Sequence, residues 1–356
     1  MLFTRLIRAI RKHLSEVTWL SIITLMFAHA ALSWGLLLLA GESNLASPES
    51  FLYYYVVTTS TVGFGDLSPE THYGKLVVAL IQIPLGLALF GALLGKLGQS
   101  VSKILRQIMT GEKDFSDYAD HILIFGWHNL RTQKIVSHIL GDSKRQGRKI
   151  LLCVVEEMEH PLLDNPMVEF ARLASFTDNS ELKRVAAQDA DRIIVDGDND
   201  DQSFTCALKL SSLVAEDCHI SVYFNDETKV EMLNKYTSNV ECNSSKTAEI
   251  LVRAMQDPGF SRLQDEMMST LHGNTQFSTQ VPENAPEVKF EDMFIHFKRE
   301  HDVTLLAVAE DRIGKKMHLN PSRDFIVKAG FILHYVGKER LTTDEVNWLS
   351  LATLGQ

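Results

Sequence analysis

Cysteine is scarce in this chain of 356 residues, and its few cysteines lack the spacing of a metal site. No Cys-x-x-Cys pair occurs, and no group of histidines and cysteines has the spacing that binds zinc. This excludes the common zinc-binding classes and favours reduced, buried thiols in the cytosol. The cysteines are Cys153, Cys206, Cys218 and Cys242.

An excess of positive charge is also missing. The sequence has 35 lysines and arginines against 45 aspartates and glutamates, a formal net charge of −10. Residues 111–356 have the composition of a soluble, acidic protein, which nucleic acid repels rather than attracts. No nucleic-acid partner is therefore expected.

Charged side chains are absent from residues 17–40 altogether. About 20 apolar residues are enough to cross the hydrocarbon core of a bilayer, and this run is longer than the core of a signal peptide. A second apolar run covers residues 73–101. We predict an outer helix over the first range and an inner helix over the second, both spanning a membrane. His29, inside the first run, is expected to form a hydrogen bond with a neighbouring helix.

Lysine and arginine are missing from residues 41–72, whereas basic residues precede the first apolar run and follow the second. Positive charge marks the cytoplasmic side of a membrane protein. Both termini are therefore predicted to lie in the cytoplasm. Residues 1–16 are expected to form an amphipathic segment that lies against membrane lipid.

The connection between the two runs reads SPESFLYYYVVTTSTVGFGD. Ser47 suits a helix N-cap and Pro48 the first helical position, which predicts a short re-entrant helix at 48–59. Gly63 and Gly65 then allow backbone angles that other residues avoid, so that successive carbonyl groups can face one side. Irregular backbone at this depth is tolerated where it lines an ion path. The carbonyls concerned are those of Thr61, Val62, Gly63 and Phe64.

The segment TVGFGD, with the aromatic pair Tyr53 and Tyr54 before it and a span on either side, resembles the signature of potassium channels. Phe64 is a variant found in that family. The resemblance implies a pore domain at 17–105, a homotetramer around one axis, and K+ held by carbonyls of a filter at 60–66. It also implies that the pore helix donates hydrogen bonds to the last filter residue. The filter residues are Thr61, Val62, Gly63, Phe64, Gly65 and Asp66.

The inner helix contains residues that favour bending. Pro84 removes one backbone donor, and Gly86 and Gly91 add small positions. One interpretation is a gating hinge at these three residues. The other is close packing between helices through small side chains.

Apolar strands alternate with helical segments along residues 119–258, after a polar linker at 106–118. This alternation predicts an α/β fold with a doubly wound parallel sheet. Order and spacing resemble the RCK domain (regulator of potassium conductance), which is Rossmann-like. The resemblance implies pairing helices up to about residue 273 and a smaller α+β lobe at 288–340. It also suggests that an internal start at Met109 supplies additional soluble copies of the domain.

The resemblance further implies control by an intracellular ligand. The turn GWHNLR follows the first strand, where nucleotide-binding domains carry a glycine-rich turn. One glycine is kept; the other two positions hold a histidine and an arginine, and the arginine could pair with a phosphate. One interpretation is a site for an NAD- or ADP-type nucleotide, and the other is a retained fold with an empty pocket. The candidate residues are Gly126, Trp127, His128, Arg131, Glu156 and Asp178.

A second candidate ligand is Ca2+. Asp196, Asp198 and Asp200 follow a predicted strand closely, and hard cations bind several carboxylate oxygens. The glycine and distal glutamate of an EF-hand loop are missing. The alternative is therefore a solvated acidic loop.

These features predict an integral protein of a prokaryotic inner or plasma membrane. The first hypothesis is a homotetrameric potassium channel, not an enzyme, gated by an intracellular nucleotide or Ca2+. A membrane-anchored oxidoreductase would need an intact nucleotide turn, which is absent. The alternative is a membrane-anchored, nucleotide-binding regulatory subunit of a cation transporter, although such a subunit would not need its own filter.

Overall fold

The structure is a computed structural model that describes residues 18–142, 144, 147–215 and 218–353. The amphipathic segment predicted at 1–16 lies outside these residues. The chain divides into two compact units, Met1–Gln107 and Ile108–Gln356. Each unit has its own core, so the two are considered separately.

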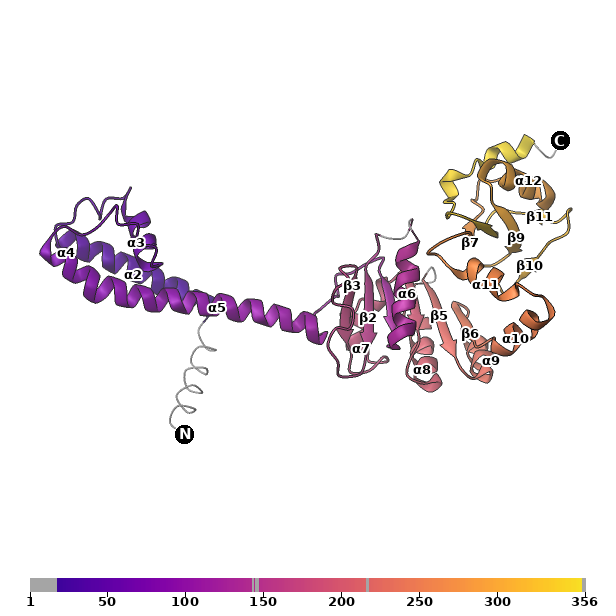
Figure 1. Ribbon diagram of the computed structural model, residues 1–356, viewed down its shortest axis with the longest axis horizontal. Helices are drawn as coiled ribbons and strands as arrows, with labels where there is room; N and C mark the ends of the chain where they lie inside the picture. Colours follow the sequence, from indigo (N-terminus) through magenta and orange to yellow (C-terminus); the bar gives the residue numbers. More distant parts are fainter. Residues whose placement is uncertain (1–17, 143, 145–146, 216–217, 354–356) are drawn as a thin grey trace. The chain divides into compact units, whose positions relative to one another are not determined.

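The first unit consists of helices (Figure 1). Helix α2 (Trp19–Leu39) begins after Thr18, whose side chain accepts a hydrogen bond from the Ser21 amide. A short helix, α3 (Phe51–Thr59), leads into the irregular segment after Thr59. Helix α4 (His72–Val77), a π-helical turn η1 (Val78–Gln82) and helix α5 (Ile83–Thr110) then follow without interruption. In the described part of the chain, α2 and the continuous helix His72–Thr110 are long and apolar enough to cross a membrane.

Two helix boundaries differ from those predicted. The short helix begins at Phe51 rather than at 48, because Ser47 and the residues after it close a separate turn; the Ser50 amide donates to Ser47 Oγ at 3.3 Å. The inner helix, predicted at 73–101, continues to Thr110, so the predicted linker at 106–118 is helical in its first part. Neither proline nor glycine occurs after Gly98 until Gly111, which adopts a φ of 70° and ends the helix.

The second unit is built on a six-stranded parallel sheet, which confirms the predicted doubly wound fold. Because the strand order reverses direction at β1, the carboxyl ends of β1 and β4 flank the position where such folds bind ligands. In spatial order the strands are β3 (Val168–Arg172), β2 (Ile150–Val154), β1 (Ile122–Phe125), β4 (Arg192–Val195), β5 (His219–Phe224) and β6 (Val240–Ser244).

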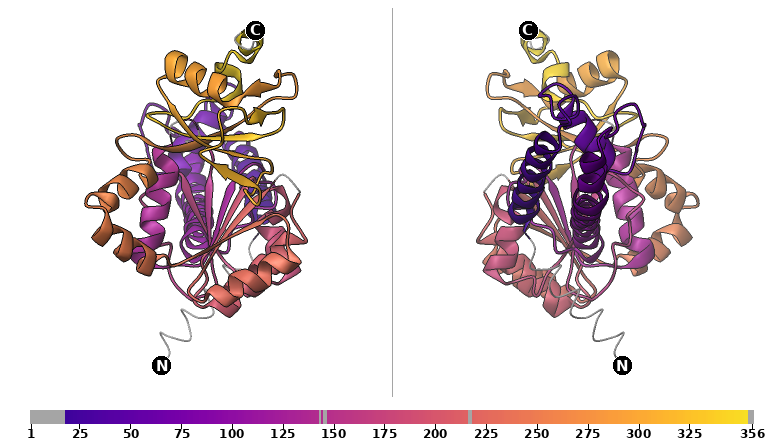
Figure 2. Two further views of the ribbon diagram at one scale, coloured as in Figure 1. Left: turned by 90° about the vertical axis from the view of Figure 1, so that its right-hand side faces the viewer. Right: turned by 90° about the vertical axis from the view of Figure 1, so that its left-hand side faces the viewer.

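The two faces of this sheet are covered by different helices (Figure 2). Alternate residues of a strand point to opposite faces. Ile122 and Ile124 accordingly pack with α6 (Asn129–Gly141), while Leu123 and Phe125 pack into the core on the other face. The helices of that second face are α7 (Asn179–Arg184), α8 (Asp200–Ser211) and α9 (Glu227–Tyr236).

Strand β6 was not expected from the sequence. It lies at the sheet edge, and only Val240 and Cys242 are apolar within VECNS. An edge strand has one neighbour and one exposed side, so it needs few apolar residues. Its alternation was too weak to predict a strand.

Helices α10 (Thr247–Gln256) and α11 (Phe260–Met268) follow the sheet and contain no buried residue. Each has apolar side chains on one side and polar side chains on the other, as expected for a helix that packs on a partner. The exposed apolar residues of this pair and its flank are Leu251, Val252, Met255, Leu263, Met268 and Leu271.

The final lobe is a four-stranded antiparallel sheet with one long helix, α12 (Phe290–His301). It begins at β7 and its core reaches Leu351, so it is larger than the predicted range 288–340. Strand β7 reads TQFSTQ, and it was not predicted because most of its residues are polar. The strand order is β10 (Met317–Leu319), β9 (Thr304–Ala309), β12 (Ile332–Gly337) and β7 (Thr275–Gln280), beside a two-stranded pair of β8 (Val288–Lys289) and β11 (Ile326–Val327).

Candidate functional site

The segment after α3 has an alternating backbone. Thr61, Gly63 and Gly65 have φ angles of 64°, 57° and 81°, whereas Val62 and Phe64 between them do not have a positive φ. When residues of positive and negative φ alternate, N–H groups gather on one side of the chain and carbonyls on the other. Thr61–Gly65 is therefore a short strip of oxygens facing one way.

These oxygens have no partner within the described part of the chain. The amide of Gly63 donates to the Val57 carbonyl at 3.1 Å, and the amide of Thr61 donates to the Thr58 carbonyl at 3.2 Å. No hydrogen bond to the carbonyls of residues 61–64 occurs among the described residues. The segment is thus held by its N–H groups, while its carbonyls stay available to a cation.

The positive φ of Thr61 carries a cost. A β-branched residue in this region is a true outlier, and such strain costs about 1–3 kcal/mol unless the surroundings hold it. Strained backbone of this kind gathers at functional sites. The strained φ thus occurs at a residue that the sequence predicts for the filter.

The far end of the segment is tied back to the helix that precedes it. Tyr53 Oη donates a hydrogen bond of 2.8 Å to Asp66 Oδ2. This geometry agrees with the expectation that Asp66 accepts from the pore helix. The six predicted filter residues, 61–66, are consecutive and form one continuous exposed loop.

The three predicted hinge residues occupy different surroundings. Pro84 lies two residues after the end of the π-helical turn, where its missing N–H leaves the hydrogen-bond ladder free to change register. A Cβ atom at Gly86 would lie 2.5 Å from Thr59 Cγ2, so this glycine allows close packing against α3. A Cβ at Gly91 would meet no atom within 4 Å. The surroundings of Gly86 support the packing interpretation there, while Pro84 and the π-turn support local flexibility.

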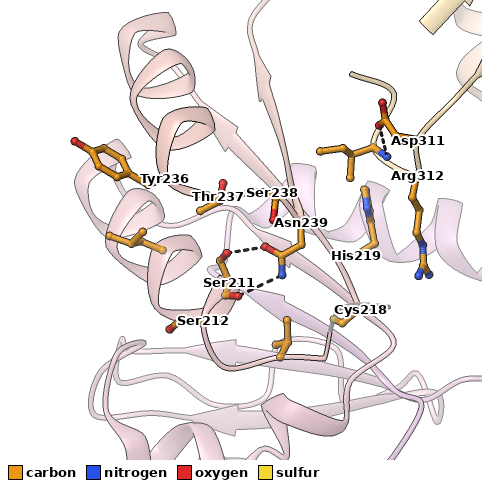
Figure 3. A pocket seen from close by; sticks show the side chains of 13 residues that line it. Ser211, Ser212, Cys218, His219, Tyr236, Thr237, Ser238, Asn239, Asp311 and Arg312 are labelled. Carbon is orange, nitrogen blue, oxygen red and sulfur yellow. Dashed lines mark hydrogen bonds between the residues drawn. The ribbon is translucent and has the colours of Figure 1, made fainter. Parts of the chain in front are cut away.

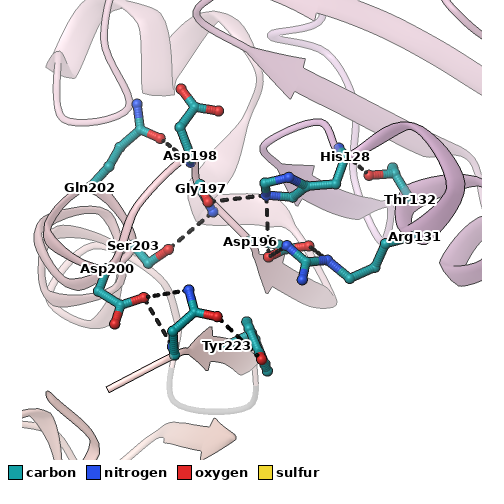
Figure 4. Close-up of polar contacts among 11 residues, drawn as sticks. His128, Arg131, Thr132, Asp196, Gly197, Asp198, Asp200, Gln202, Ser203 and Tyr223 are labelled. Atoms are coloured by element: carbon teal, nitrogen blue, oxygen red, sulfur yellow. Dashed lines mark hydrogen bonds and ion pairs between the residues drawn. The ribbon is translucent and has the colours of Figure 1, made fainter. Parts of the chain in front are cut away.

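The second candidate site lies at the carboxyl ends of β1 and β4 (Figure 4). Gly126 ends β1 with a φ of 106°, and a Cβ there would lie 1.8 Å from the Asp196 carbonyl oxygen. Only glycine therefore fits at this turn. The glycine that the sequence retains serves the contact between two strands.

The space beyond Gly126 is occupied by an ion pair (Figure 4). Arg131 donates two hydrogen bonds to Asp196, with Nε–Oδ2 at 2.7 Å and Nη2–Oδ1 at 2.8 Å. His128 Nε2 donates to the Gly197 carbonyl at 3.1 Å and lies 3.5 Å from Asp196 Oδ1. The Arg131 guanidinium also lies over the Tyr223 ring, 5.1 Å from its centre. The predicted phosphate partner is thus already bound to a carboxylate.

Asp196 is 4% exposed, and burial raises the pKa of its carboxyl above the ordinary value, against the opposing charges of Arg131 and His128. A buried carboxylate depends on its partner because removal of the partner leaves an uncompensated charge. Arg131 and Asp196 are therefore mutually dependent. Asp196 occupies the Nε and Nη2 groups of Arg131, so a ligand that binds this same edge of the guanidinium must replace the contact.

The remaining predicted nucleotide residues are not gathered at this point. Trp127 is half-buried and packs against the α6 face of the sheet. Glu156 is exposed. Asp178 caps α7, accepting hydrogen bonds from the amides of Ser180 and Glu181. The structure unites Gly126, His128 and Arg131 with Asp196 and Tyr223.

The predicted calcium site is not assembled. Asp196 binds Arg131, and Asp200 accepts hydrogen bonds from the amides of Asn225 and Asp226 at 3.0 and 2.8 Å. Asp198 is exposed and points away from both in Figure 4. Across the described residues, no group of three or more His, Cys, Asp or Glu side chains could hold a metal ion. The three carboxylates do not converge, because Asp196 and Asp200 have separate local partners and Asp198 is directed elsewhere.

The second unit contains several cavities. One of about 660 Å³ lies between the end of α8, the start of β5, the segment before β6 and the turn after β9, and its lining includes Ser211, Asn239 and Arg312 (Figure 3). Another, of about 490 Å³, lies beside α6 and is bordered by Arg131, Ile135 and Ile194. Of the predicted site residues, Arg131 alone lines either cavity.

Comparisons with known proteins identify the first unit. Residues 17–103 match the family described as "Ion channel". The chain is 26% identical over 170 residues to the provisionally named potassium channel protein YugO of Bacillus subtilis (strain 168), over 46% of this chain and 49% of YugO. The chain thus spans about half the length of this curated relative.

Similar solved structures cover between 61% and 92% of this chain. "GsuK channel bound to NAD" is 17% identical over 88% of this chain and 55% of that one, with a TM-score of 0.42. "Structure of the human SLO3 gating ring" is 11% identical over 61% of this chain and 44% of that one, with a TM-score of 0.43. Residues 17–103 of this chain thus match the ion channel family, and a Rossmann-like unit with a six-stranded parallel sheet follows them.

Proposed function

We propose that this chain forms a potassium-selective channel, assembled as a homotetramer and gated by an intracellular ligand. The alternating backbone of Thr61–Gly65, with its unpartnered carbonyls, carries the proposal. Four such strips around an axis would surround a dehydrated K+ with oxygen, in place of its water shell. Both termini would lie in the cytoplasm, in agreement with the distribution of basic residues.

Rubidium and sodium uptake into liposomes containing the purified chain tests the filter. Gly63→Ala and Gly65→Ala place a side chain where φ is positive, which costs about 1–2 kcal/mol per residue. Gly65→Asp adds a charge. We expect all three variants to lose selective rubidium uptake. Gly35→Ala is the matched control, because Gly35 likewise has no neighbour within 4 Å but no positive φ.

Continued selective uptake in the Gly63 and Gly65 variants would contradict the filter assignment. A complete lack of uptake by the wild-type chain would contradict the channel itself. That result would leave the membrane-anchored regulatory subunit as the better hypothesis.

Assembly of the second unit is proposed to use α10 and α11. Their apolar sides are exposed in the single chain, and a second copy would bury them. Additional soluble copies that start at Met109 could join the same ring. Leu251→Glu together with Met255→Glu should weaken self-association in analytical ultracentrifugation, while Glu249→Gln on the same helix should not.

The proposed ligand is a nucleotide, since two GsuK structures are named for bound NAD and bound ADP. Gly126, His128 and Arg131 would receive its phosphate. A phosphate is a bidentate partner for arginine, as a carboxylate is. Binding would therefore exchange Asp196 for phosphate at Arg131, and the change at the ends of β1 and β4 would shift the pore equilibrium.

Thermal unfolding of the full chain in detergent, with ADP or NAD present, tests this exchange. Asp196→Asn weakens the competitor and should increase the stabilisation by nucleotide, whereas Arg131→Gln should abolish it. Asp198→Asn serves as the control because its exposed side chain forms no ion pair in the structure. If the nucleotide stabilised the wild-type chain and all variants equally, or stabilised none of them, nucleotide binding at this site would be contradicted.

A further inference from the structure

Three consecutive tyrosines on α3 contact three different parts of the pore domain. Successive residues of an α-helix point about 100° apart, so Tyr53, Tyr54 and Tyr55 cannot share a face. Tyr53 contacts the filter loop at Asp66, as described above. Tyr54 and Tyr55 instead point to the two spanning helices, one each.

Tyr55 contacts the outer helix through a short hydrogen bond. The Tyr55 hydroxyl lies 2.7 Å from His29 Nδ1, and the two rings are 5.5 Å apart at their centres. Both side chains are 5% exposed. A bond of this length between buried groups is strong, because no water competes for either partner.

Tyr54 contacts the inner helix. Its hydroxyl donates to Gln82 Oε1 at 3.4 Å, and Gln82 is completely buried. Gln82 is the last residue of the π-helical turn, and such turns occur mostly at functional positions. This longer hydrogen bond joins the pore helix to the irregular part of the inner helix.

His29, Tyr54, Tyr55 and Gln82, here called the polar layer, lie where the three helices meet. A Cβ atom at Gly86 would lie 3.3 Å from His29 Cε1, so the imidazole also touches the inner helix. Within the described residues, His29 Nε2 and Gln82 Nε2 have no hydrogen-bond partner. Unpartnered buried polar groups are costly, and polar residues inside a membrane are usually retained for function.

The position of the filter depends on α3. The amides of Thr61 and Gly63 are bonded to carbonyls near the end of this helix, at Thr58 and Val57. Any rotation or tilt of α3 therefore moves the filter carbonyls. Groups that fix α3 between the two spans also fix the distance between opposite oxygens of a tetramer.

We propose that the polar layer positions the filter, and that His29 and Gln82 are positioning residues for ion selectivity. The proposal rests on the proposed potassium-channel function. His29 would hold α3 against the outer helix, and Gln82 would hold it against the π-helical turn. Loss of either contact lets the filter widen, which admits Na+ together with K+.

The ratio of rubidium to sodium uptake by the full-length channel in liposomes tests the proposal. Tyr55→Phe and His29→Leu should each lower this ratio by about tenfold, and the double variant should lower it no further. Tyr54→Phe and Gln82→Leu should form a second pair with a smaller effect, because their hydrogen bond is longer. His29→Asn returns an amide near the position of Nδ1 and should restore most of the ratio. Tyr73→Phe is the matched control, since Tyr73 is exposed at the start of the inner helix.

The experiment distinguishes failure of the positioning role from failure of the proposed channel function. Selective uptake by the wild-type chain together with unchanged ratios in the phenylalanine variants would overturn the positioning role and leave the channel function intact. The positioning role would also be overturned if the double variant lowered the uptake ratio by the product of the two single effects. The two residues would not then act through their shared contact. A wild-type chain without selective uptake would overturn both proposals.

Discussion

Tyr53 on the short helix α3 and Asp66 at the far end of the proposed filter segment are joined by a hydrogen bond of 2.8 Å. The bond closes a loop that contains Thr61–Gly65 and keeps its last residue against the pore helix. The acceptor is a carboxylate, and hydrogen bonds to ionised groups are stronger than those between neutral groups.

Removal of the Tyr53 hydroxyl should therefore reduce the fraction of conducting channels. Tyr53→Phe deletes one hydrogen bond at an exposed position, worth about 1 kcal/mol, which corresponds to about a fivefold loss. Steady-state rubidium uptake measures it. Tyr73→Phe is the control for loss of a tyrosine hydroxyl as such. If Tyr53→Phe left steady-state rubidium uptake unchanged, the hydrogen bond would not support conduction.

The pairing of Arg131 with Asp196 predicts a large effect on stability. Arg131→Ala leaves a buried carboxylate without its partner and should lower the free energy of unfolding by about 2–3 kcal/mol. The double variant Arg131→Ala, Asp196→Asn should recover part of this loss, because the uncompensated charge is gone. Urea unfolding monitored by tryptophan fluorescence measures both, and additive losses would contradict the coupling.

The turn at Gly126 tolerates no side chain. Gly126→Ala combines a positive φ with a Cβ atom placed on the Asp196 carbonyl, so we expect a loss of more than about 2 kcal/mol. Gly147→Ala is the control, since a Cβ there would meet nothing within 4 Å. Equal unfolding midpoints for the two variants would show that the β1–β4 contact is looser than the structure describes.

Acid should destabilise the second unit through buried histidines. Burial lowers the pKa of His121, although its Nε2 donates to the Val185 carbonyl at 3.0 Å, and burial likewise lowers the pKa of His160. Below the ordinary value of about 6.5, the unfolded chain binds protons that the folded chain does not. Stability should therefore be constant above about pH 6.5, fall as the pH drops below it, and level off once the folded histidines are protonated.

Unfolding in urea at pH 7.5, 6 and 5 measures this dependence, which cannot exceed about 1.4 kcal/mol per pH unit for each histidine. His121→Gln should flatten the curve while keeping a donor for Val185. If His121→Gln had the same pH dependence of unfolding as the wild-type chain, His121 would not be a source of the acid destabilisation.

Much of the architecture was accessible from sequence because its signals are strong. A charge-free run at 17–40 predicts a span, and apolar strands such as ILIF and ILLCV predict buried parallel strands. Strands β6 and β7 escaped prediction because their sequences are mostly polar and lie at sheet edges. The helical continuation to Thr110 was hidden by its polar residues, which helices tolerate as well as linkers do.

The ligand site was harder to predict. Arg131 and Asp196 are 65 residues apart, and the sequence suggested two different sites for them, one for phosphate and one for Ca2+. The order of the strands explains the contact. Because β1 and β4 are neighbours in the sheet, Arg131 after β1 meets Asp196 at the end of β4. The contacts of Tyr54 and Tyr55 were also not foreseen, although three adjacent tyrosines on one helix must point in three directions.

The inner helix ends at Thr110, and the chain is fastened to the sheet of the second unit at once. The Met109 carbonyl accepts from the His160 amide at 2.9 Å, the Gly111 carbonyl accepts from the Arg172 amide at 3.0 Å, and Arg184 donates to the Lys113 carbonyl at 2.7 Å. The residues at the end of α5 and directly after it are therefore hydrogen-bonded to the second unit, without a flexible linker among residues 109–113. Three or four flexible residues inserted after Gly111 would lengthen this junction, and in the proposed channel they should uncouple the pore from the second unit.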